Sequence, residues 1–333
     1  MPMKEVTRRE LISTAIGGTA AVALSRELVA RETTSRPSDA PLRPFGNTKE
    51  KVSLLGVGGF HLGVPGEEEG IRIVQEAIDN GATFFDNAWC YHDGGSEERV
   101  GKAVRGGRRE KAFLMTKFCG RDKKTAMQHL EDSLRRLQTD HLDLWQFHEV
   151  VYENDPEMIF APDGGIEAAD LAKKQGKTRY IGFTGHKYPW VLLKMLAYEY
   201  PWDAVQMPLN VLDGSFQSFE QIVLPVLVKR GIAVLAMKTR GGGSILQSGA
   251  CTPEELWRYV ITLPVTTVVS GMESLNLLHK NLKTARELRP MTPREMEDIR
   301  KRTAGSASTG KQEVYKTSRA YDSRFGRRLH GIQ

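Results

Sequence analysis

Four ionisable side chains stand at or just after the ends of three successive apolar runs. Asp86 ends the run ATFFD, Tyr91 follows five residues later, and Lys117 and His148 end the runs AFLMTK and LDLWQFH. A free phenol has a pKa of about 10 and exchanges protons poorly at neutral pH. A lysine ammonium beside Tyr91 would lower that pKa, and a carboxylate would keep the lysine charged and oriented. This set suits the delivery of a proton to an oxygen atom.

A neutral imidazole at His148 could hydrogen-bond a substrate oxygen and hold it in position. The set therefore suits the reversible reduction of a carbonyl, in which hydride reaches carbon and a proton reaches oxygen. No side chain donates hydride, so this chemistry requires a nicotinamide cofactor. Each residue alone also has a structural explanation: Asp86 as a helix cap, Tyr91 as a wall aromatic, Lys117 and His148 as polar strand ends. Their joint placement favours catalysis.

Eight short runs of apolar, β-branched or aromatic residues recur along the chain, at intervals of roughly thirty residues as in repeated β-α units. Such runs without alternation are typical of strands buried on both faces, as in parallel sheets. They are VSLLGVG from Val52, ATFFD from Ala82, AFLMTK from Ala112, LDLWQFH from Leu142, TRYIGFT from Thr178, DAVQM from Asp203, IAVLAMK from Ile232 and TTVVSG from Thr266. Helical patterns lie between them, for example over 68–81, 124–138 and 189–200.

Eight β-α units predict an α/β fold, a (β/α)8 TIM barrel. A doubly wound open sheet is the alternative. It is disfavoured because the first run continues as GVGGFHLG rather than as a GxGxxG turn opening a helix, and no acidic residue follows at the spacing of a Rossmann unit. In a barrel the active site lies at the carboxyl ends of the strands, where the four ionisable residues would meet.

The sequence resembles the aldo-keto reductase family over nearly all of residues 48–288. The resemblance rests on FFDNAWCYHDGGSEERVG, LMTKF and DHLDLWQFH, followed in order by GKTRYIGFTGH, AVQMPLN and VVSGMESLNLLHKNL. It implies an NAD(P)(H)-dependent enzyme that reduces aldehydes or ketones to alcohols, or the reverse. It also implies that Asp86, Tyr91, Lys117 and His148 form the catalytic tetrad, with Tyr91 as the general acid in reduction.

The resemblance places the nicotinamide amide near the ends of the fifth and sixth runs. Gln206 matches the family's glutamine, and Thr184 can replace its serine. Gly185, however, stands where the family has an asparagine. His186 or Asn210 could supply the missing contact.

The loop KTRGGG after the seventh run resembles the family's pyrophosphate site. Met237 stands before it, where an aromatic residue often stacks on the nicotinamide. Lys238 and Arg240 can face a pyrophosphate, and the glycines let backbone amides approach it. A flexible loop at the top of the barrel is the alternative interpretation.

The turn GMES after the eighth run bears on the choice of dinucleotide. Family members that favour NADP(H) usually present a basic residue there, whereas this chain has Glu273, and Leu277 where Arg or Gln is common. A carboxylate near the ribose favours a free 2′-hydroxyl. We therefore expect NAD(H) to be used at least as well as NADP(H). The predicted cofactor residues are Thr184, Gln206, Lys238, Arg240, Gly241, Gly242, Gly271, Met272, Glu273 and Asn281.

Substrate contacts are expected from loop aromatics at Phe60, Trp89 and Trp190, with His61 and Tyr152 as further candidates. Each is as compatible with packing as with contact. The substrate is expected to be a small carbonyl compound or alcohol, and the sequence leaves the oligomeric state open.

No metal site is indicated. The cysteines, Cys90, Cys119 and Cys251, have neither CxxC nor CxxH spacing, which disfavours zinc and iron-sulfur centres. A metal-dependent hydrolase is disfavoured too, because no His-x-His or carboxylate cluster stands at the strand ends. A Cys90–Cys119 disulfide stays open as an alternative to free thiols.

The formal charge of +6 does not indicate nucleic-acid binding. Residues 32–293 carry a net charge of −1, whereas residues 294–333 carry +5 and residues 1–31 carry +2. The positive charge is therefore concentrated at the two ends of the chain, and the main domain lacks a basic face.

The first thirty residues resemble a twin-arginine export signal, because Arg8 and Arg9 precede an apolar stretch over 11–24 and the small-x-small sequence Ala21-Val22-Ala23. An amphipathic helix is the alternative. We expect a signal over 1–30, a linker over 31–47, the barrel over 48–288, and a C-terminal helix with a basic tail over 289–333. An exported enzyme would have to retain its nicotinamide tightly. An uncleaved signal would anchor it to the membrane, and without a signal the protein would be cytoplasmic.

A barrel that binds nucleotide without catalysis, as a regulatory or scaffold subunit, is the alternative function.

Overall fold

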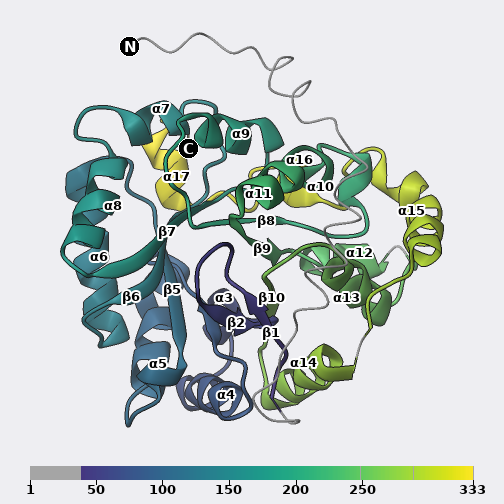
Figure 1. The fold of residues 1–333 in the computed structure, drawn as a ribbon, viewed down its shortest axis with the longest axis horizontal. Helices are drawn as coiled ribbons and strands as arrows, with labels where there is room; N and C mark the ends of the chain where they lie inside the picture. The colour runs from purple at the N-terminus through teal and green to yellow at the C-terminus, as the bar shows by residue number, and fades with distance from the viewer. Residues whose placement is uncertain (1–38, 248, 288, 333) are drawn as a thin grey trace.

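The computed structural model describes residues 39–247, 249–287 and 289–332, so the expected export signal lies outside the described residues. Eight parallel strands close into a barrel in the order β10-β3-β4-β5-β6-β7-β8-β9 (Figure 1). They are β3 (Leu55–Gly58), β4 (Phe84–Asp86), β5 (Phe113–Phe118), β6 (Leu142–Phe147), β7 (Thr178–Thr184), β8 (Ala204–Pro208), β9 (Ala233–Met237) and β10 (Thr267–Gly271). The predicted TIM barrel is confirmed, and each predicted run overlaps one barrel strand.

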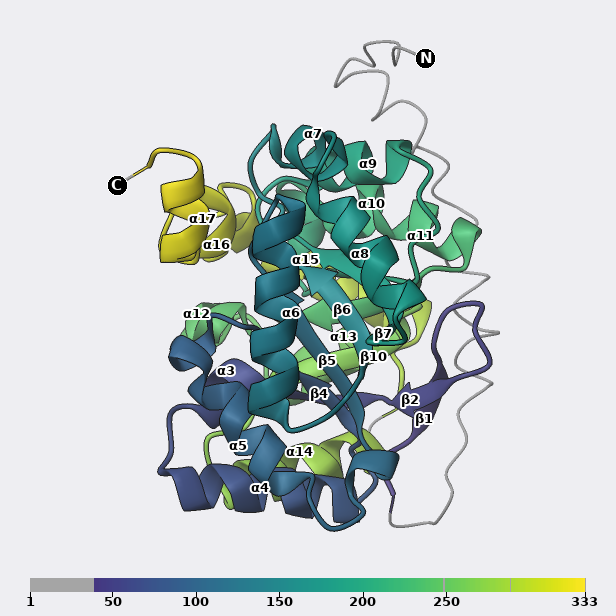
Figure 2. The same ribbon diagram turned by 90° about the vertical axis from the view of Figure 1, so that its left-hand side faces the viewer.

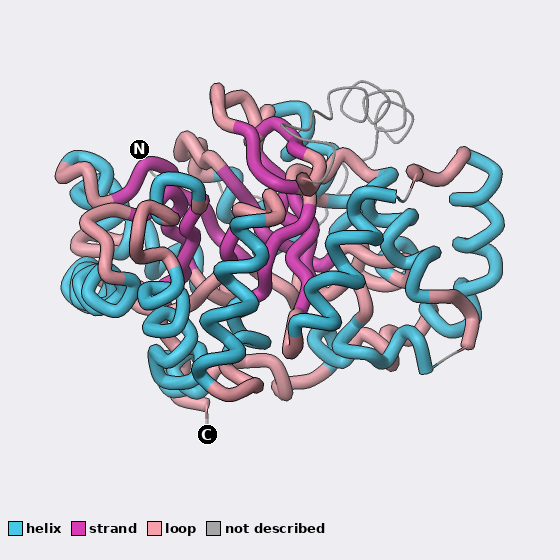
Figure 3. Tube along the Cα trace, turned by 90° about the horizontal axis from the view of Figure 1, so that it is seen from below, coloured by secondary structure: helices cyan, strands magenta, loops and turns pink. Residues whose placement is uncertain are grey.

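Helices surround the strands (Figure 3). The three patterns predicted between strands are α4 (Glu67–Asp79), α6 (Lys123–Leu137) and α9 (Pro189–Ala197). The others up to the C-terminal region are α3 (Gly59–Leu62), α5 (Gly95–Ala103), α7 (Asp155–Phe160), α8 (Gly165–Lys174), α10 (Phe219–Ile222), α11 (Leu224–Arg230), α12 (Ser244–Gln247), α13 (Pro253–Thr262) and α14 (Leu275–Glu287). None of the helices in the described ranges is long and apolar enough to cross a membrane.

Local sequence signals explain where these helices begin and end. The Asp122 carboxylate accepts a hydrogen bond from the Thr125 amide at 2.8 Å, which caps the start of α6. Helix α4 ends at Asp79, and Gly81 follows with a φ of 77°, a left-handed conformation that glycine adopts without strain. These caps fix the lengths of the helices that carry the chain from one strand to the next.

The barrel strands are apolar because both of their faces are buried. Every residue of β5 and β6 is buried. The large apolar cluster fills the space between strands and helices, and a smaller one fills the barrel interior around Phe84, Phe113 and Leu144. Parallel strands buried in this way give continuous apolar runs, which is why they could be recognised in the sequence.

An antiparallel hairpin closes the amino-terminal end of the barrel. Strands β1 (Leu42–Pro44) and β2 (Lys51–Ser53) pair with each other, and Phe45 is fully buried against the barrel's inner cluster. Arg43 is also buried and donates hydrogen bonds to the carbonyl oxygens of Val265 and Ile261 at 2.9 and 3.0 Å. Residues 39–47, predicted as part of a linker, therefore fold against the barrel, whereas residues 31–38 of that linker lie outside the described residues.

The C-terminal region lies at the opposite end of the barrel from that hairpin (Figure 2). After α15 (Pro293–Ala307), the chain forms α16 (Val314–Thr317) and α17 (Arg324–Leu329). We call residues 313–332 the C-terminal strap. The Asp322 carboxylate of the strap accepts hydrogen bonds from Lys187 Nζ at 2.6 Å and from the Tyr152 hydroxyl at 3.1 Å. The strap thus packs over loops at the carboxyl ends of the strands.

Candidate active site

The carboxyl ends of β4 and β5 bring Asp86 and Lys117 into a buried ion pair. Lys117 Nζ donates hydrogen bonds to Asp86 Oδ1 and to the carbonyl oxygen of Asn87, and both side chains of the pair are almost inaccessible. The pair forms because β4 and β5 are neighbours in the barrel, so the residues at or next to their carboxyl ends face the same opening. Such a pair holds the lysine charged and fixed in position.

Tyr91 stands beside this pair, at the start of a short turn after β4. Lys117 Nζ lies 4.7 Å from the centre of its ring. The turn continues through His92 and Asp93, which have φ values of 51° and 54°, and this left-handed conformation is uncommon for residues other than glycine. The phenol is therefore held by an unusual backbone conformation and by contact with the lysine.

The protonation of Tyr91 differs from the expectation. Burial, and then the negative charge of Asp86, raise the pKa of Tyr91 well above its usual value. The predicted lowering by Lys117 is outweighed, because the phenol is removed from water. At neutral pH the proton accordingly stays on Tyr91, as a proton donor requires.

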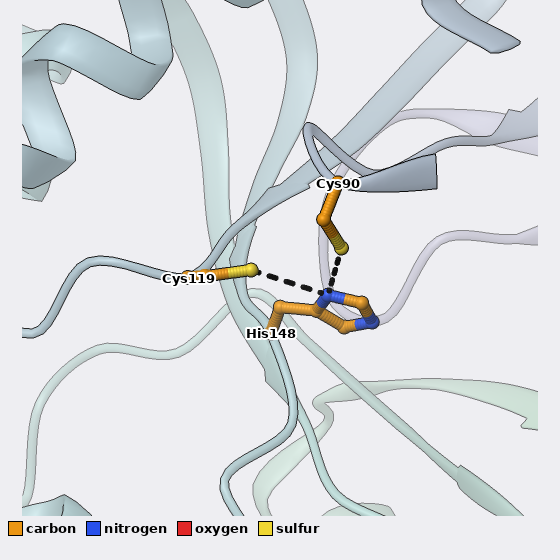
Figure 4. A group of neighbouring side chains, drawn as sticks. All are labelled: Cys90, Cys119 and His148. Atoms are coloured by element: carbon orange, nitrogen blue, oxygen red, sulfur yellow. Dashed lines mark hydrogen bonds between the residues drawn. The ribbon is translucent and has the colours of Figure 1, made fainter. Parts of the chain in front are cut away.

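His148 follows β6 and lies against Tyr91, with the two rings edge to face at 5.6 Å. Burial, and then the charge of Lys117, lower the pKa of His148 well below its usual value. The imidazole is therefore neutral, as expected. Its Nδ1 atom lies 3.4 Å from Cys90 Sγ and 3.7 Å from Cys119 Sγ (Figure 4). In the structure these cysteines are free thiols.

Gln206, on β8, contacts the tetrad through Asp86. Its Nε2 atom donates a hydrogen bond to Asp86 Oδ2 at 2.9 Å, whereas its Oε1 atom is buried without a partner. Thr184, its neighbour in register across β7 and β8, is also buried. A buried amide oxygen without a partner is costly, and a bound amide would satisfy it.

Asn210 and His186, the residues expected to replace the family's asparagine, both contact the strap. Asn210 Nδ2 donates to the Tyr315 hydroxyl at 2.8 Å and to Glu313 Oε1 at 3.2 Å, so the strap occupies this amide. His186 is buried, and burial lowers its pKa to about 4. Its Nε2 atom lies 3.6 Å from an Asp322 oxygen, so this ring also faces the strap.

The KTRGGG loop contacts the strap as well. Lys238 Nζ lies 4.2 Å from the centre of the Tyr321 ring, and burial of its ammonium lowers the pKa of Lys238 to about 8. Arg240 Nε is buried without a hydrogen-bond partner. Gly241 and Gly242 have φ values of 55° and 69°, and a Cβ at Gly242 would lie 2.4 Å from the Tyr321 hydroxyl. The loop thus offers two cations beside a backbone that only glycine fits.

The turn after β10 pairs with the first βα loop. His61 Nδ1 lies 2.7 Å from Glu273 Oε1, and its ring packs over Gly271. Asn281 Nδ2 donates to Ser270 Oγ at 3.2 Å, and Met272 is fully buried. Of these residues, Glu273 is the one whose charge faces solvent.

Of the three aromatic residues expected to contact substrate, one lies beside the tetrad and two stack on other rings. Phe60 is 51% exposed and meets the Tyr91 ring edge to face at 5.5 Å, beside the tetrad. Trp89 stacks on His129 at 3.6 Å and meets Phe325 of the strap edge to face. Trp190, on α9, stacks on Tyr188 and donates a hydrogen bond to Glu153. Only Phe60 among the three is in ring contact with Tyr91.

Comparison with known proteins agrees with this geometry. The sequence profile described as "Aldo/keto reductase family" matches residues 54–255. The chain belongs to the aldo/keto reductase family.

This aldo/keto reductase is similar in sequence to proteins named as oxidoreductases. The chain is 33% identical over 225 residues to the uncharacterized oxidoreductase YrpG of Bacillus subtilis (strain 168), covering 60% of this chain and 66% of that protein. It is 28% identical over 221 residues to L-galactose dehydrogenase of Arabidopsis thaliana, covering 62% and 68%. The holo form of aldo-keto reductase AKR11C1 from Bacillus halodurans superposes with a TM-score of 0.67 at 26% identity, covering 78% of this chain and 95% of that chain.

One departure of this aldo/keto reductase from the family pattern has a steric cause. A Cβ at Gly185 would lie 2.4 Å from Leu192 Cδ1 and 2.5 Å from the Val150 carbonyl oxygen. An asparagine does not fit there without movement of the backbone.

The sequence left a Cys90–Cys119 pair open but did not indicate its contact with His148, and it did not place the strap residues. Cys90 and Cys119 come together only through the ends of β4 and β5, and their spacing of 29 residues resembles no ligand motif. The strap residues Tyr321, Asp322 and Phe325 lie in a polar segment without helical or strand periodicity. The alternation of aromatic and charged residues in that segment was the one signal available.

Proposed function

We propose that this aldo-keto reductase is an NAD(P)(H)-dependent enzyme that reduces an aldehyde or ketone to an alcohol, or catalyses the reverse reaction. The observation that carries the proposal is the meeting of Tyr91 with Lys117 and His148 at one end of the barrel. Oxidoreductase relatives support the class of reaction. The substrate is a small carbonyl compound or alcohol.

Each member of the tetrad has a role that its environment supports. Tyr91 donates its hydroxyl proton to the carbonyl oxygen in reduction, and its raised pKa keeps that proton in place until then. Lys117, held by Asp86, provides a positive charge that favours the tyrosinate left behind. His148, neutral, orients the substrate oxygen. Phe60 forms part of the substrate wall.

The residues present fit a nicotinamide dinucleotide, which when bound supplies the hydride. Gln206 Oε1 and Arg240 Nε are buried polar atoms without partners, as expected of groups that hold a ligand. Lys238 and Arg240 would hold the pyrophosphate, and Tyr321 of the strap would have to move away from Gly242 for the phosphates to approach the backbone of Gly241 and Gly242.

Thr184 and Gln206 would hold the nicotinamide end of that dinucleotide. Asn281 and the turn of Gly271, Met272 and Glu273 would hold the adenosine end. The Glu273 carboxylate disfavours a 2′-phosphate, so we propose that NAD(H) serves at least as well as NADP(H). The ratio of kcat/KM with NADH and NADPH tests this, and a strong preference for NADPH contradicts it.

The decisive experiment replaces the tyrosine. Tyr91→Phe should lower kcat/KM by about 100-fold or more while the Kd of the nucleotide stays within about threefold, because only proton transfer is lost. Tyr188→Phe makes the same chemical change at a residue that stacks on Trp190 and is the matched control. Full activity of Tyr91→Phe would refute the mechanism. Nucleotide binding without turnover of any carbonyl by the unmodified protein would instead favour a non-catalytic regulatory or scaffold barrel.

Export is a separate part of the proposal. The Arg8-Arg9 pair and the apolar stretch after it support passage through the twin-arginine pathway, to an extracytoplasmic location. Replacement of both arginines by lysine should leave the protein in the cytoplasm. Cell fractionation measures this, and unchanged location in the variant contradicts the signal. Protein purified without added nucleotide should release its nicotinamide on denaturation, because an exported enzyme must carry its cofactor.

A further inference from the structure

Three metal-ligating side chains gather beside the tetrad. The Sγ atoms of Cys90 and Cys119 and a ring nitrogen of His148 all lie within 4.8 Å of one another. Cys119 and His148 are buried, and Cys90 is half-buried. Figure 4 shows both sulfur atoms directed at the same nitrogen of the imidazole. Cys90 lies in the loop after β4, Cys119 follows β5, and His148 follows β6.

The backbone around these side chains is fixed by hydrogen bonds that continue the barrel ladder past the strand ends. The Trp89 amide donates to the Lys117 carbonyl oxygen at 2.8 Å, and the His148 amide donates to the Phe118 carbonyl oxygen at 2.8 Å. Each bond lies within one residue of a member of the group. The three donor atoms are therefore held by the scaffold rather than by a loose loop, as a preorganised site requires.

The distances match a tetrahedral site. With metal–sulfur and metal–nitrogen bonds of about 2.3 and 2.0–2.1 Å, tetrahedral angles separate sulfur from nitrogen by about 3.6 Å. The two observed separations from His148 Nδ1 are 3.4 Å to Cys90 and 3.7 Å to Cys119. The two thiols also contact each other, so all three side chains converge on one point, and one cation between them would satisfy all of them.

We propose that Cys90, Cys119 and His148 Nδ1 bind a soft divalent cation of the Zn²⁺ class in a Cys₂His site with its fourth position open. Thiolate and imidazole ligands select such ions over Mg²⁺ or Ca²⁺. Binding converts two thiols to thiolates and releases two protons, so the cation and its two thiolates together carry no net charge.

The site has a direct consequence for the tetrad. A cation on Nδ1 leaves the ring proton of His148 on Nε2, so that nitrogen becomes a fixed hydrogen-bond donor. Cys90 precedes Tyr91 in the chain, so its ligation also ties down the turn that carries the phenol. The inference goes beyond the proposed function and does not depend on it, because metal binding is read directly.

The test uses the full-length protein, reduced with a phosphine and freed of metal by a chelator, under anaerobic conditions. Co²⁺ is titrated as a spectroscopic probe, followed by competition with Zn²⁺. We expect one equivalent of Co²⁺ to produce sulfur-to-cobalt charge-transfer absorption and the d–d bands of a tetrahedral site. We also expect release of about two protons per ion, measured with an indicator dye.

Cysteine variants locate the site. Mutation of residues that only hydrogen-bond the metal ligands typically weakens metal binding about 10- to 100-fold. Loss of a ligand itself should weaken binding more, so Cys90→Ser and Cys119→Ser should each raise the Kd of Co²⁺ by at least about 100-fold. Cys251→Ser makes the same change at a buried cysteine outside the group and should keep the wild-type spectrum. Circular dichroism checks each fold, and if Cys119→Ser does not fold, the half-buried Cys90 decides the test.

Three results would overturn the proposal. The first is no charge-transfer band although all three thiols react with a thiol reagent. The second is a band that survives in Cys90→Ser, or one lost in Cys251→Ser. The third is a Cys90–Cys119 disulfide, found by mass spectrometry of the isolated protein, together with no metal binding after its reduction. Nucleotide titration of the same samples reports on the proposed function separately.

Discussion

Lys117 reaches both partners that define its role: its ammonium pairs with the Asp86 carboxylate and lies 4.7 Å from the centre of the Tyr91 ring. The ion pair is almost inaccessible to water, so each charge depends on the other. The same contact therefore supports both the stability of the barrel and the proposed proton transfer.

Removal of the Lys117 side chain should lower both stability and activity. Lys117→Met leaves Asp86 buried without its cation, which typically costs about 3–5 kcal/mol of folding free energy, and it removes the charge next to Tyr91. The free energy of unfolding, measured with urea, and kcat/KM should both fall. Lys123→Met breaks the exposed pair with Glu167 and should change stability by less than about 1 kcal/mol. Equal stability of the two variants would contradict the burial argument.

Nucleotide affinity should depend on pH through Lys238. Burial lowers the pKa of this lysine to about 8, so it loses its positive charge as pH rises through that value. A pyrophosphate prefers the charged form, and the Kd should therefore increase by about tenfold above pH 8, as expected for loss of one charge-assisted hydrogen bond. Fluorescence titrations from pH 6.5 to 9.5 measure it. Lys238→Arg keeps its charge over this range and should remove the dependence; a flat wild-type profile would exclude Lys238 from the phosphate site.

Acid should destabilise the protein through Asp155. Burial raises the pKa of this carboxyl, but Arg121 and His330 outweigh it and hold the pKa at about 2. Because the unfolded value is about 3.9, the stabilisation is complete above pH 4 and is lost as pH falls towards 2. The free energy of unfolding should fall more steeply in this window for the wild type than for Asp155→Asn. Asp79→Asn, at an exposed ion pair, is the control and should behave as wild type.

Restoration of the family's asparagine should damage this protein. In Gly185→Asn the new Cβ meets Leu192 and the Val150 carbonyl oxygen, so we expect a loss of about 1–3 kcal/mol in stability and no gain in nucleotide affinity. Thermal unfolding and nucleotide titration measure the two effects. The control is Gly176→Asn, where nothing lies within 4 Å of the new atom. Tighter nucleotide binding by Gly185→Asn would show that the backbone adjusts.

The barrel could be predicted because its signals are local. Strands such as β5 and β6 are buried along their whole length, so their sequences are mostly apolar runs. The tetrad followed from the same argument, since residues at the ends of neighbouring parallel strands share one opening. The hairpin was missed because Leu42–Pro44 lies between polar, proline-rich stretches and is stabilised by distant contacts such as that of Arg43 with Val265.

Neither the position of the strap nor the raised pKa of Tyr91 could be predicted, because both depend on contacts between distant parts of the chain. Asp322 and His330 are polar residues whose burial depends on partners more than a hundred residues away. The pKa of Tyr91 depends on how completely the loops exclude water, and no spacing in the sequence reports that.

The position of the strap has a consequence for the order of assembly. Residues 313–332 are synthesised after all eight strands, and domains begin to fold from the N-terminal side during translation. The hairpin can close one end of the barrel early, but Tyr321 reaches the lysine- and glycine-rich loop only after all eight strands have been synthesised. The nascent barrel therefore passes through a stage in which the strap does not yet cover that loop, so the loop is shielded only in the last steps of folding.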